Sequence, residues 1–156
     1  MSDGALASEY EAADESPGLL LWQVTNRWQS AQRASLKPLG LTHVQFVLLA
    51  SLVWLRADGP VTQRQLADHA VTDPMMTSQV LRALERRKLV QRSPHPDDRR
   101  ARALTATPHG RRLANEAIVA VEACDRAFFQ TLPDRDGFVR ALRALTATQV
   151  QPAASL

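Results

Sequence analysis

The segment from Asp73 to Gly110 constrains the fold of this chain more than any other part of it. It begins with Asp73-Pro74, a pair that suits the N-cap and the first position of a helix. Two short segments, 89–93 and 101–105, then flank a loop with two prolines and four charged residues, which predicts two strands joined by a stiff, projecting tip. A new helix is expected after Thr107-Pro108. This order of helix, strand, charged tip, strand and helix leaves few folds open.

Apolar residues at three- and four-residue steps predict helices in most of the remaining chain. Two of these helices begin with capping-box spacing, Thr42 to Gln45 and Thr62 to Gln65. The element before Asp73 is a short helix near 63–69, so two short helices are separated by a brief turn, which is the helix-turn-helix order. A turn is expected at Asp58-Gly59-Pro60. The fold class is therefore mostly α with a small β-wing, with helices at 17–37, 42–55, 63–69, from 74, at 108–131 and around 138–145.

Composition excludes several classes of protein. With 156 residues and 45% apolar content the chain is expected to form one domain or one domain with an oligomerisation element. The longest apolar run, inside 44–55, is too short to cross a bilayer, and the N-terminus lacks a basic signal-peptide start, which predicts a cytoplasmic location. The single cysteine, Cys124, and the four histidines show no metal-ligand spacing, so no metal, no cofactor and no enzyme activity are expected.

Charge is concentrated in two regions. Residues 1–16 hold five acids and no base, which predicts a disordered acidic tail, and a second flexible tail is expected at 149–156. Residues 82–102 hold eight of the 19 lysines and arginines against three acids, a net charge of +5 in a chain of net charge +3. A local basic excess of this size favours a nucleic-acid partner.

The helix that starts at Pro74 has one packed side and one free side. Its expected packed residues are Thr77, Val80, Leu81 and Leu84, and its expected free residues are Met75, Ser78, Gln79, Arg82 and Arg86. Gln79 can pair with an adenine edge and Arg82 with a guanine in the major groove of DNA, and Ser78 can bond a base or a phosphate. The N-terminal end of the preceding helix, at Thr62 and Gln63, suits a backbone phosphate. An ordinary solvated helix face is the alternative interpretation.

The hairpin tip adds a second basic element. Adjacent Arg99 and Arg100 suit a narrow A·T-rich minor groove, where the negative potential is strongest. Asp97 and Asp98 oppose this charge, and we expect one of these carboxylates to hold an arginine fork in a fixed direction. A solvated turn of mixed charge is the alternative for the tip.

The combined pattern over residues 17–148 resembles the MarR family of bacterial transcription regulators. The resemblance is carried by four stretches: Leu39-Gly40-Leu41-Thr42 with Gln45-Phe46, Gln65-Leu66-Ala67, Leu81-Arg82-Ala83-Leu84-Glu85, and the wing from Leu89-Val90-Gln91-Arg92 through Asp97-Asp98-Arg99-Arg100 and Leu104 to Thr107-Pro108-His109-Gly110. Two residues depart from the family pattern. Lys88 stands where the family usually has Gly, which predicts a helix that ends without a left-handed residue or with a strained one, and Ala106 stands where Leu is common.

The resemblance implies a homodimer in which 17–38 and 108–148 form the helical dimerisation region and 39–107 form the winged helix-turn-helix DNA-binding domain. Apolar residues near the C-terminus, such as Phe138, Leu142 and Leu145, point to the same conclusion because a monomer offers little core to cover them. Such a dimer is expected to read a pseudo-palindromic operator in double-stranded DNA, with half-sites about 10 base pairs apart.

The resemblance also implies a small aromatic or anionic effector that releases DNA. The candidate ligand-binding residues are Trp22, Asn26, His43 and Phe46, with ordinary core packing and helix-end hydrogen bonding as the alternative. Cys124 is expected to be a buried, inert thiol, because the peroxide-sensing relatives carry their reactive cysteine in the first helix.

The sequence therefore predicts a dimeric, sequence-specific DNA-binding transcriptional regulator, and a repressor is the favoured interpretation. The alternative is a winged-helix module that binds another protein and ignores DNA. That module would present an apolar or acidic face, and the arginines of the helix and of the tip argue against it.

Overall fold

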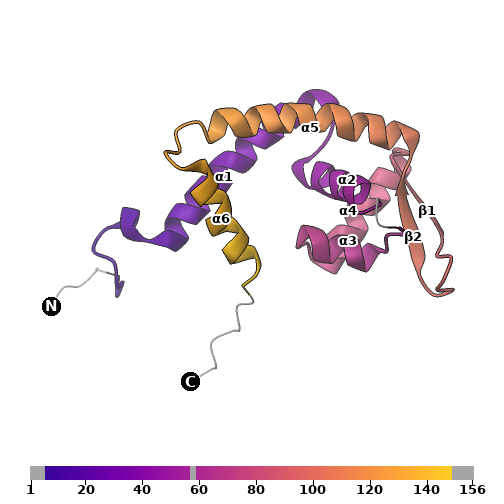
Figure 1. The fold of residues 1–156 in the computed structure, drawn as a ribbon, viewed down its shortest axis with the longest axis horizontal. Helices are drawn as coiled ribbons and strands as arrows, with labels where there is room; N and C mark the ends of the chain where they lie inside the picture. Colours follow the sequence, from indigo (N-terminus) through magenta and orange to yellow (C-terminus); the bar gives the residue numbers. More distant parts are fainter. Residues whose placement is uncertain (1–5, 57–58, 149–156) are drawn as a thin grey trace, which may run out of the picture. The chain divides into compact units, whose positions relative to one another are not determined.

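The computed structural model describes residues 6–56 and 59–148. Its elements are mostly helical, with one two-stranded sheet (Figure 1). They are η1 (Ala13–Glu15), α1 (Pro17–Leu36), η2 (Lys37–Leu39), α2 (His43–Leu55), α3 (Gln63–Ala70), α4 (Pro74–Arg86), β1 (Val90–Pro94), β2 (Arg102–Ala106), α5 (Pro108–Phe128) and α6 (Arg135–Thr146). The predicted element order is confirmed.

The chain forms two compact units that divide within α5, Met1–Cys124 and Asp125–Leu156. In the first unit α1 and α5 contribute to the same core as the winged helix-turn-helix elements, because Leu36, Ala114, Ala117 and Val121 pack in the cluster that holds the leucines of α2. This division differs from the expected boundaries at 38/39 and 107/108, which separate the predicted DNA-binding domain from the predicted dimerisation region. The assignment of 17–38 and 108–148 to dimerisation stays a prediction.

The core of the first unit is built from side chains that lose all contact with solvent. The fully buried leucines come from α1, α2, α3, α4, the turn after α4 and β2: Leu36, Leu48, Leu49, Leu52, Leu66, Leu81, Leu84, Leu89 and Leu104. Burying one such side chain stabilises the fold by about 1.5–3 kcal/mol before entropy is counted. A core shared by five elements therefore fixes the position of α4 relative to the wing.

Helix starts follow the predicted caps. Thr42 with Gln45 and Thr62 with Gln65 form capping boxes at α2 and α3. The Asp73 carboxylate accepts the N–H of Met76 at 2.9 Å, with Pro74 in the first helical turn. The sequence thus determines where each helix of the helix-turn-helix begins.

The ends of α3 and α4 share an unusual feature, a left-handed residue that is not glycine. Val71 has φ 53° and Lys88 has φ 57°. At the end of α4 the N–H of Leu89 bonds the carbonyl of Leu84 at 2.9 Å, which is the Schellman pattern that usually places Gly at the left-handed position. The strained helix end predicted at Lys88 is therefore confirmed.

The wing is an antiparallel pair in which Val90 faces Ala106 and Pro94 faces Arg102. Both strands begin and end one residue later than predicted. The shift follows from the Schellman turn, because Leu89 is still part of the helix end. Leu104 also donates to the carbonyl of Val61 at 2.7 Å, so the wing is joined to the segment that leads into α3.

Three further predictions need correction or fall outside the description. The acidic segment is not without structure, since η1 forms within it and Ser16 caps α1 by accepting the N–H of Leu19 at 3.3 Å. α5 ends at Phe128 rather than near Thr131, and α6 begins at Arg135 with its N-cap at Asp134. Residues 1–5 of the tail predicted at 1–16 lie outside the described residues, as do the tail predicted at 149–156 and Asp58 of the expected turn.

Candidate nucleic-acid interface

The exposed side of α4 carries the polar residues that the sequence assigns to base contact. Thr77, Leu81 and Leu84 are buried, whereas Gln79 and Arg82 are exposed. Arg86 is exposed and Ser78 is half-buried. Because α-helical residues advance by about 100° each, positions 75, 79, 82 and 86 form one stripe. We call the residues Met75, Ser78, Gln79, Arg82 and Arg86 the α4 stripe.

Two residues of the α4 stripe are joined to each other. Arg82 donates from Nη2 to the hydroxyl oxygen of Ser78 at 2.9 Å. This bond joins two residues that lie one helical turn apart on the surface of α4. It orients the guanidinium and leaves its other N–H groups for a ligand. Ser78 thereby acts as a positioning residue for Arg82.

The N-terminus of α3 is more occupied than the sequence suggests. The Thr62 hydroxyl accepts the N–H of Gln65 at 3.2 Å, so it serves the capping box. The side-chain oxygen of Gln63 accepts from Nη1 of Arg92 at 3.0 Å. The amide NH2 of Gln63 is the part of this side chain that remains for a phosphate.

Arg92 is a residue that sequence reasoning missed. Its Nε donates to Oε1 of Glu85 at 2.9 Å, and both side chains are 27% exposed. Together with the bond to Gln63, this places one guanidinium between β1, the last turn of α4 and the first turn of α3. We call these three residues the wing anchor. Side chains alternate between the two faces of a strand, so Arg92, which follows exposed Gln91, could be expected to face inward. Only the fold shows which carboxylate it contacts.

The wing tip carries exposed charges of both signs. Arg99 and Arg100 are exposed, as are Asp97 and Asp98. Asp98 accepts the backbone N–H of Arg100 at 2.9 Å, and the N–H of Asp97 bonds Nδ1 of His95 at 3.1 Å. The expected carboxylate-to-guanidinium pairing is therefore wrong for this structure. The ion pairs Arg92 with Glu85 and Arg140 with Asp134 lie elsewhere in the described chain. Asp98 supports the tip by closing a turn of the backbone, which leaves both guanidinium groups exposed.

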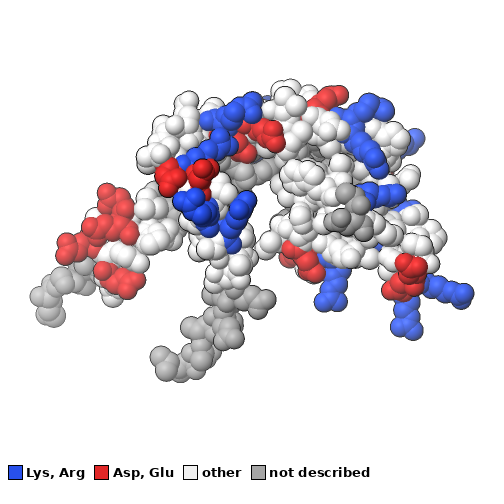
Figure 2. All heavy atoms as spheres, viewed as in Figure 1, with Lys and Arg blue, Asp and Glu red and all other residues white. Residues whose placement is uncertain are grey.

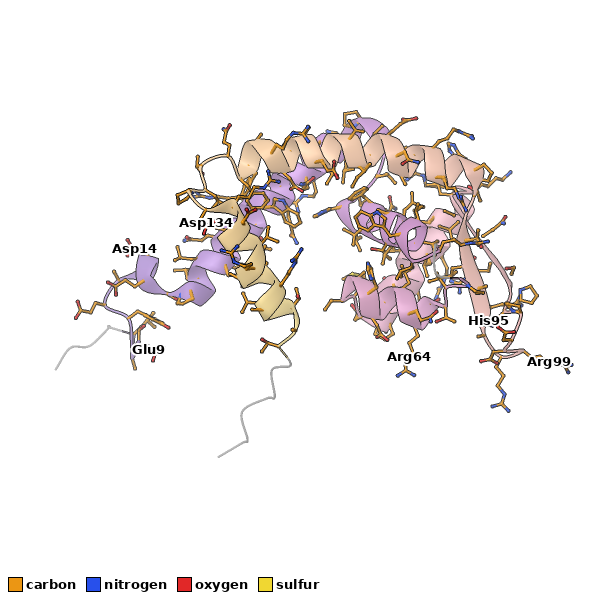
Figure 3. All side chains as sticks on the ribbon, viewed as in Figure 1. Glu9, Asp14, Arg64, His95, Arg99 and Asp134 are labelled. Carbon is orange, nitrogen blue, oxygen red and sulfur yellow. The ribbon has the colours of Figure 1, made fainter. Side chains whose placement is uncertain are left out.

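Arg64 is a second missed residue. It lies at the start of α3 beside Gln63 and is exposed. In Figure 3 the labelled side chains of Arg64 and Arg99 project from α3 and from the wing tip on the same edge of the first unit. Its position next to the capping box, on the side of α3 away from buried Leu66, is the sequence signal that indicates it.

Figure 2 shows how charge is distributed on this face. Basic side chains project at α3 and at the wing tip, with acidic atoms beside them at both places. A separate acidic cluster covers the segment before α1, where Glu9, Glu11, Asp14 and Glu15 lie. The basic edge, where Arg64, Arg99 and Arg100 are exposed, can face a polyanion.

The four candidate ligand-binding residues do not gather in one pocket of the described chain. Trp22 is 68% exposed, and Asn26 donates to its backbone carbonyl at 2.7 Å. Phe46 is buried in the core. His43 packs edge-on against Trp28, with ring centroids 4.9 Å apart. The assignment of these residues to an effector remains untested.

His43 does line an open groove of about 480 Å³. We call it the α1–α2 groove. Its lining comes from α1, the start of α2, the α3–α4 turn and α4: Trp28, Gln29, Arg33, Thr42, His43, Val44, Val47, Ala70, Thr72 and Met76. Aromatic, imidazole and guanidinium groups therefore meet at one surface.

The remaining chemistry is sparse. In the part of the chain that the structure describes, no group of three or more His, Cys, Asp or Glu side chains is arranged to hold a metal ion. Cys124 is half-buried rather than fully buried. Of the helices described, none alone is long and apolar enough to cross a bilayer, although the sharply bent pair of 17–39 and 43–55 meets the same length and composition test.

The fold and its basic edge define a winged helix-turn-helix protein, and comparison with known proteins places it more closely. Residues 41–101 match the family model of the MarR family. The chain is 40% identical over 139 residues to the uncharacterized HTH-type transcriptional regulator YdcH of Bacillus subtilis, covering 88% of this chain and 95% of that protein. It is 35% identical over 137 residues to the HTH-type transcriptional repressor Rv2887 of Mycobacterium tuberculosis, covering 85% of this chain and 96% of that protein.

A solved structure agrees with these relatives. The fold matches Bordetella bronchiseptica BpsR, whose structure concerns regulation of DNA binding by 6-hydroxynicotinic acid, with a TM-score of 0.81, 28% identity and coverage of 91% of this chain and 100% of that one. The chain belongs to the MarR family and is a transcriptional regulator.

Proposed function

We propose that this regulator is a dimeric, sequence-specific DNA-binding repressor that a small aromatic or anionic effector releases from its operator. The observation that carries the proposal is the α4 stripe together with the wing anchor. One exposed helix face bears Gln79, Arg82 and Arg86, and Arg92 fixes the basic wing relative to that helix through 2.9 and 3.0 Å bonds.

The α4 stripe suits the major groove. An α-helix fits that groove, and amide and guanidinium groups discriminate adenine and guanine edges. Gln79 and Arg82 are one turn apart on the exposed side, and the Ser78 hydroxyl orients Arg82. Thr62, Gln63 and Arg64 at the start of α3 suit the adjacent phosphates.

The wing suits the minor groove. Arg99 and Arg100 are exposed at the tip, and the backbone turn at Asp98 supports them. A guanidinium inserted into a narrow groove gains from its strong negative potential without requiring base-specific bonds. An exposed basic face of this kind does not suit a module that recognises proteins, so DNA is the favoured partner.

Dimerisation is supported by an apolar surface on the first half of α1. Leu19, Leu20, Leu21, Trp22 and Val24 are all between 37% and 68% exposed. A cluster of this kind on a monomer usually marks an interface. A two-fold dimer would present two α4 helices to half-sites about 10 base pairs apart.

The α1–α2 groove is our candidate for the effector. Trp28 and His43 supply ring faces and edges, and Arg33 supplies a positive charge for a carboxylate. BpsR, whose DNA binding is regulated by 6-hydroxynicotinic acid, is the structural neighbour that favours this ligand class. Trp22, Asn26 and Phe46 would then act on the shape of α1 and α2 rather than touch the effector.

A hydrogen-bond path leads from this groove to the α4 stripe. Thr72 lines the groove, and its hydroxyl lies 2.7 Å from that of buried Thr77 on α4. Thr77 in turn donates to the carbonyl of the cap residue Asp73 at 2.8 Å. A ligand that displaces Thr72 would therefore shift the start of α4, which is the end of the helix nearest the bases.

The proposal is tested with the intergenic DNA beside the gene for this protein. We expect protection of a pseudo-palindrome in footprinting, binding by a dimer in mass photometry, and loss of affinity as salt is raised. Release by small aromatic acids is then measured on the same duplex. A chain that stays monomeric, or that ignores duplexes at low ionic strength, overturns the proposal and favours the protein-interaction module. We also propose a cytoplasmic location, which a DNA-binding role supports.

A further inference from the structure

The first turn of α4 presents apolar side chains where a DNA-reading helix usually presents polar ones. Pro74 has no N–H to offer a phosphate, and the Asp73 carboxylate already accepts the N–H of Met76 at 2.9 Å. The free carboxylate charge at this end also repels phosphate oxygens. The chemistry that normally makes a helix N-terminus an anion site is therefore weakened here.

Met75 is the most exposed apolar side chain in the first turn of α4. Its side chain is 72% exposed, although methionine is normally buried, and it lies four, seven and eleven residues before Gln79, Arg82 and Arg86. This spacing places it in line with them on the α4 stripe. Met75 therefore occupies the leading position on the surface that the proposed function directs into the major groove.

The major groove contains one apolar group that such a side chain can recognise, the C5-methyl of thymine. We propose that Met75 is a specificity-determining residue that reads a thymine methyl in each half-site. The flexible thioether chain adapts its shape to a methyl group and gains by excluding water from both surfaces. This inference rests on the proposed DNA-binding function and adds a base preference to it.

The inference also explains why two reading chemistries share one helix. Gln79 and Arg82 bond polar base edges in the middle of α4, whereas in the first turn Pro74 has no N–H, the N–H groups of Met76 and Thr77 are taken by Asp73, and the cap is negative. An apolar contact is the base contact left to the first turn, and it places the helix start over a thymine rather than over a phosphate.

The test removes the methyl group without changing any hydrogen bond. A preferred duplex is selected from a random pool with the wild-type protein, and each thymine of one half-site is replaced singly by deoxyuridine. Wild type should lose about fourfold in affinity at one position, the equivalent of ~0.8 kcal/mol for one buried methyl. Deoxyuridine outside the protected sequence serves as the control and should have no effect.

Protein variants then assign the contact. Met75→Ala should bind the thymine and deoxyuridine duplexes equally at that position, whereas Met75→Leu should retain the preference for thymine. Thermal unfolding checks that both exposed-site variants fold. Unchanged discrimination in Met75→Ala, or no sensitivity to deoxyuridine at any thymine, overturns the inference while leaving the DNA-binding function intact. Failure of wild type to select any sequence overturns the function and this inference with it.

Discussion

Arg92 on β1 donates from Nε to the Glu85 carboxylate on α4 at 2.9 Å, and so joins the wing to the end of the helix that carries the basic stripe. The same guanidinium bonds the Gln63 side chain on α3 at 3.0 Å. One planar group with several fixed donors can hold three elements at once, which a lysine cannot do. Arg92 is half-buried and paired, so we expect it to position other groups rather than to contact DNA.

Replacement of Arg92 by Ala should lower the free energy of unfolding by about 1–2 kcal/mol, because a charged hydrogen bond and a partly exposed ion pair are lost. DNA affinity should also fall, since the wing loses its link to α4. The slope of log affinity against log salt should stay that of wild type. A shallower slope would mean that Arg92 itself neutralises a phosphate.

Replacement of Arg82 by Ala should weaken operator binding by about 1–3 kcal/mol and relax preference at one base pair. The reason is the loss of a guanidinium that can pair with guanine from the exposed side of α4. Competition with duplexes changed at each position measures both effects. Lys37→Ala removes an exposed charge of the same sign outside the interface and is the matched control; equal losses in the two variants would contradict the assignment.

Replacement of Arg99 or Arg100 by Ala should reduce affinity and lower the salt slope by about one for each phosphate contact removed. Asp98→Asn provides a control in the same turn. It keeps an oxygen that can accept the N–H of Arg100, so the tip should hold its shape and the slope should not fall. If the arginine variants keep the wild-type slope, the wing tip does not contact the DNA backbone.

The backbone at Lys88 offers a test on stability alone. Its φ of 57° lies in the region that favours glycine, and its N–H bonds the carbonyl of Glu85 at 2.9 Å in the turn that ends α4. Lys88→Gly should therefore stabilise the fold by ~0.5–1 kcal/mol, the relief of strain exceeding the added entropy of the unfolded chain. Urea unfolding measures this change. A destabilised variant would show that the Lys88 side chain contributes packing that outweighs the strain.

Local signals in the sequence were enough to predict most of the fold. The capping residues Thr42, Thr62 and Asp73 act within three residues of their partners, so each helix start could be predicted from its own neighbourhood. The exposed side of α4 could be predicted for the same reason, because its periodicity is local.

Contacts between distant residues could not be predicted in the same way. Glu85 and Gln63 are separated in sequence from Arg92 by seven and 29 residues, and the sequence alone does not specify which acid or amide an arginine meets. At the wing tip the expected partner was a guanidinium, but the nearer backbone N–H of Arg100 takes the Asp98 carboxylate. A short backbone turn is formed with less loss of side-chain entropy than an exposed ion pair requires.

The base of the wing depends on a glycine with no room for a side chain. A Cβ on Gly110 would collide with the backbone carbonyl of Leu89, whose carbon lies 2.9 Å away, in the turn where Thr107 caps α5 and bonds the Lys88 carbonyl at 2.7 Å. The atoms that such a Cβ would meet belong to the backbone of Leu89, which cannot move aside as a flexible side chain would.

Gly110→Ala should therefore destabilise the protein by about 3 kcal/mol. The matched control is Gly18→Ala in α1, where a Cβ meets nothing within 4 Å and the helical backbone favours alanine. That variant should be neutral or more stable by ~0.5–1 kcal/mol. Urea unfolding of the two variants, followed by DNA binding below the transition, separates a local effect on the wing from global loss of the fold. Equal stability of the two alanine variants would show that β1 and α5 separate at little cost, contrary to the packing at Leu89.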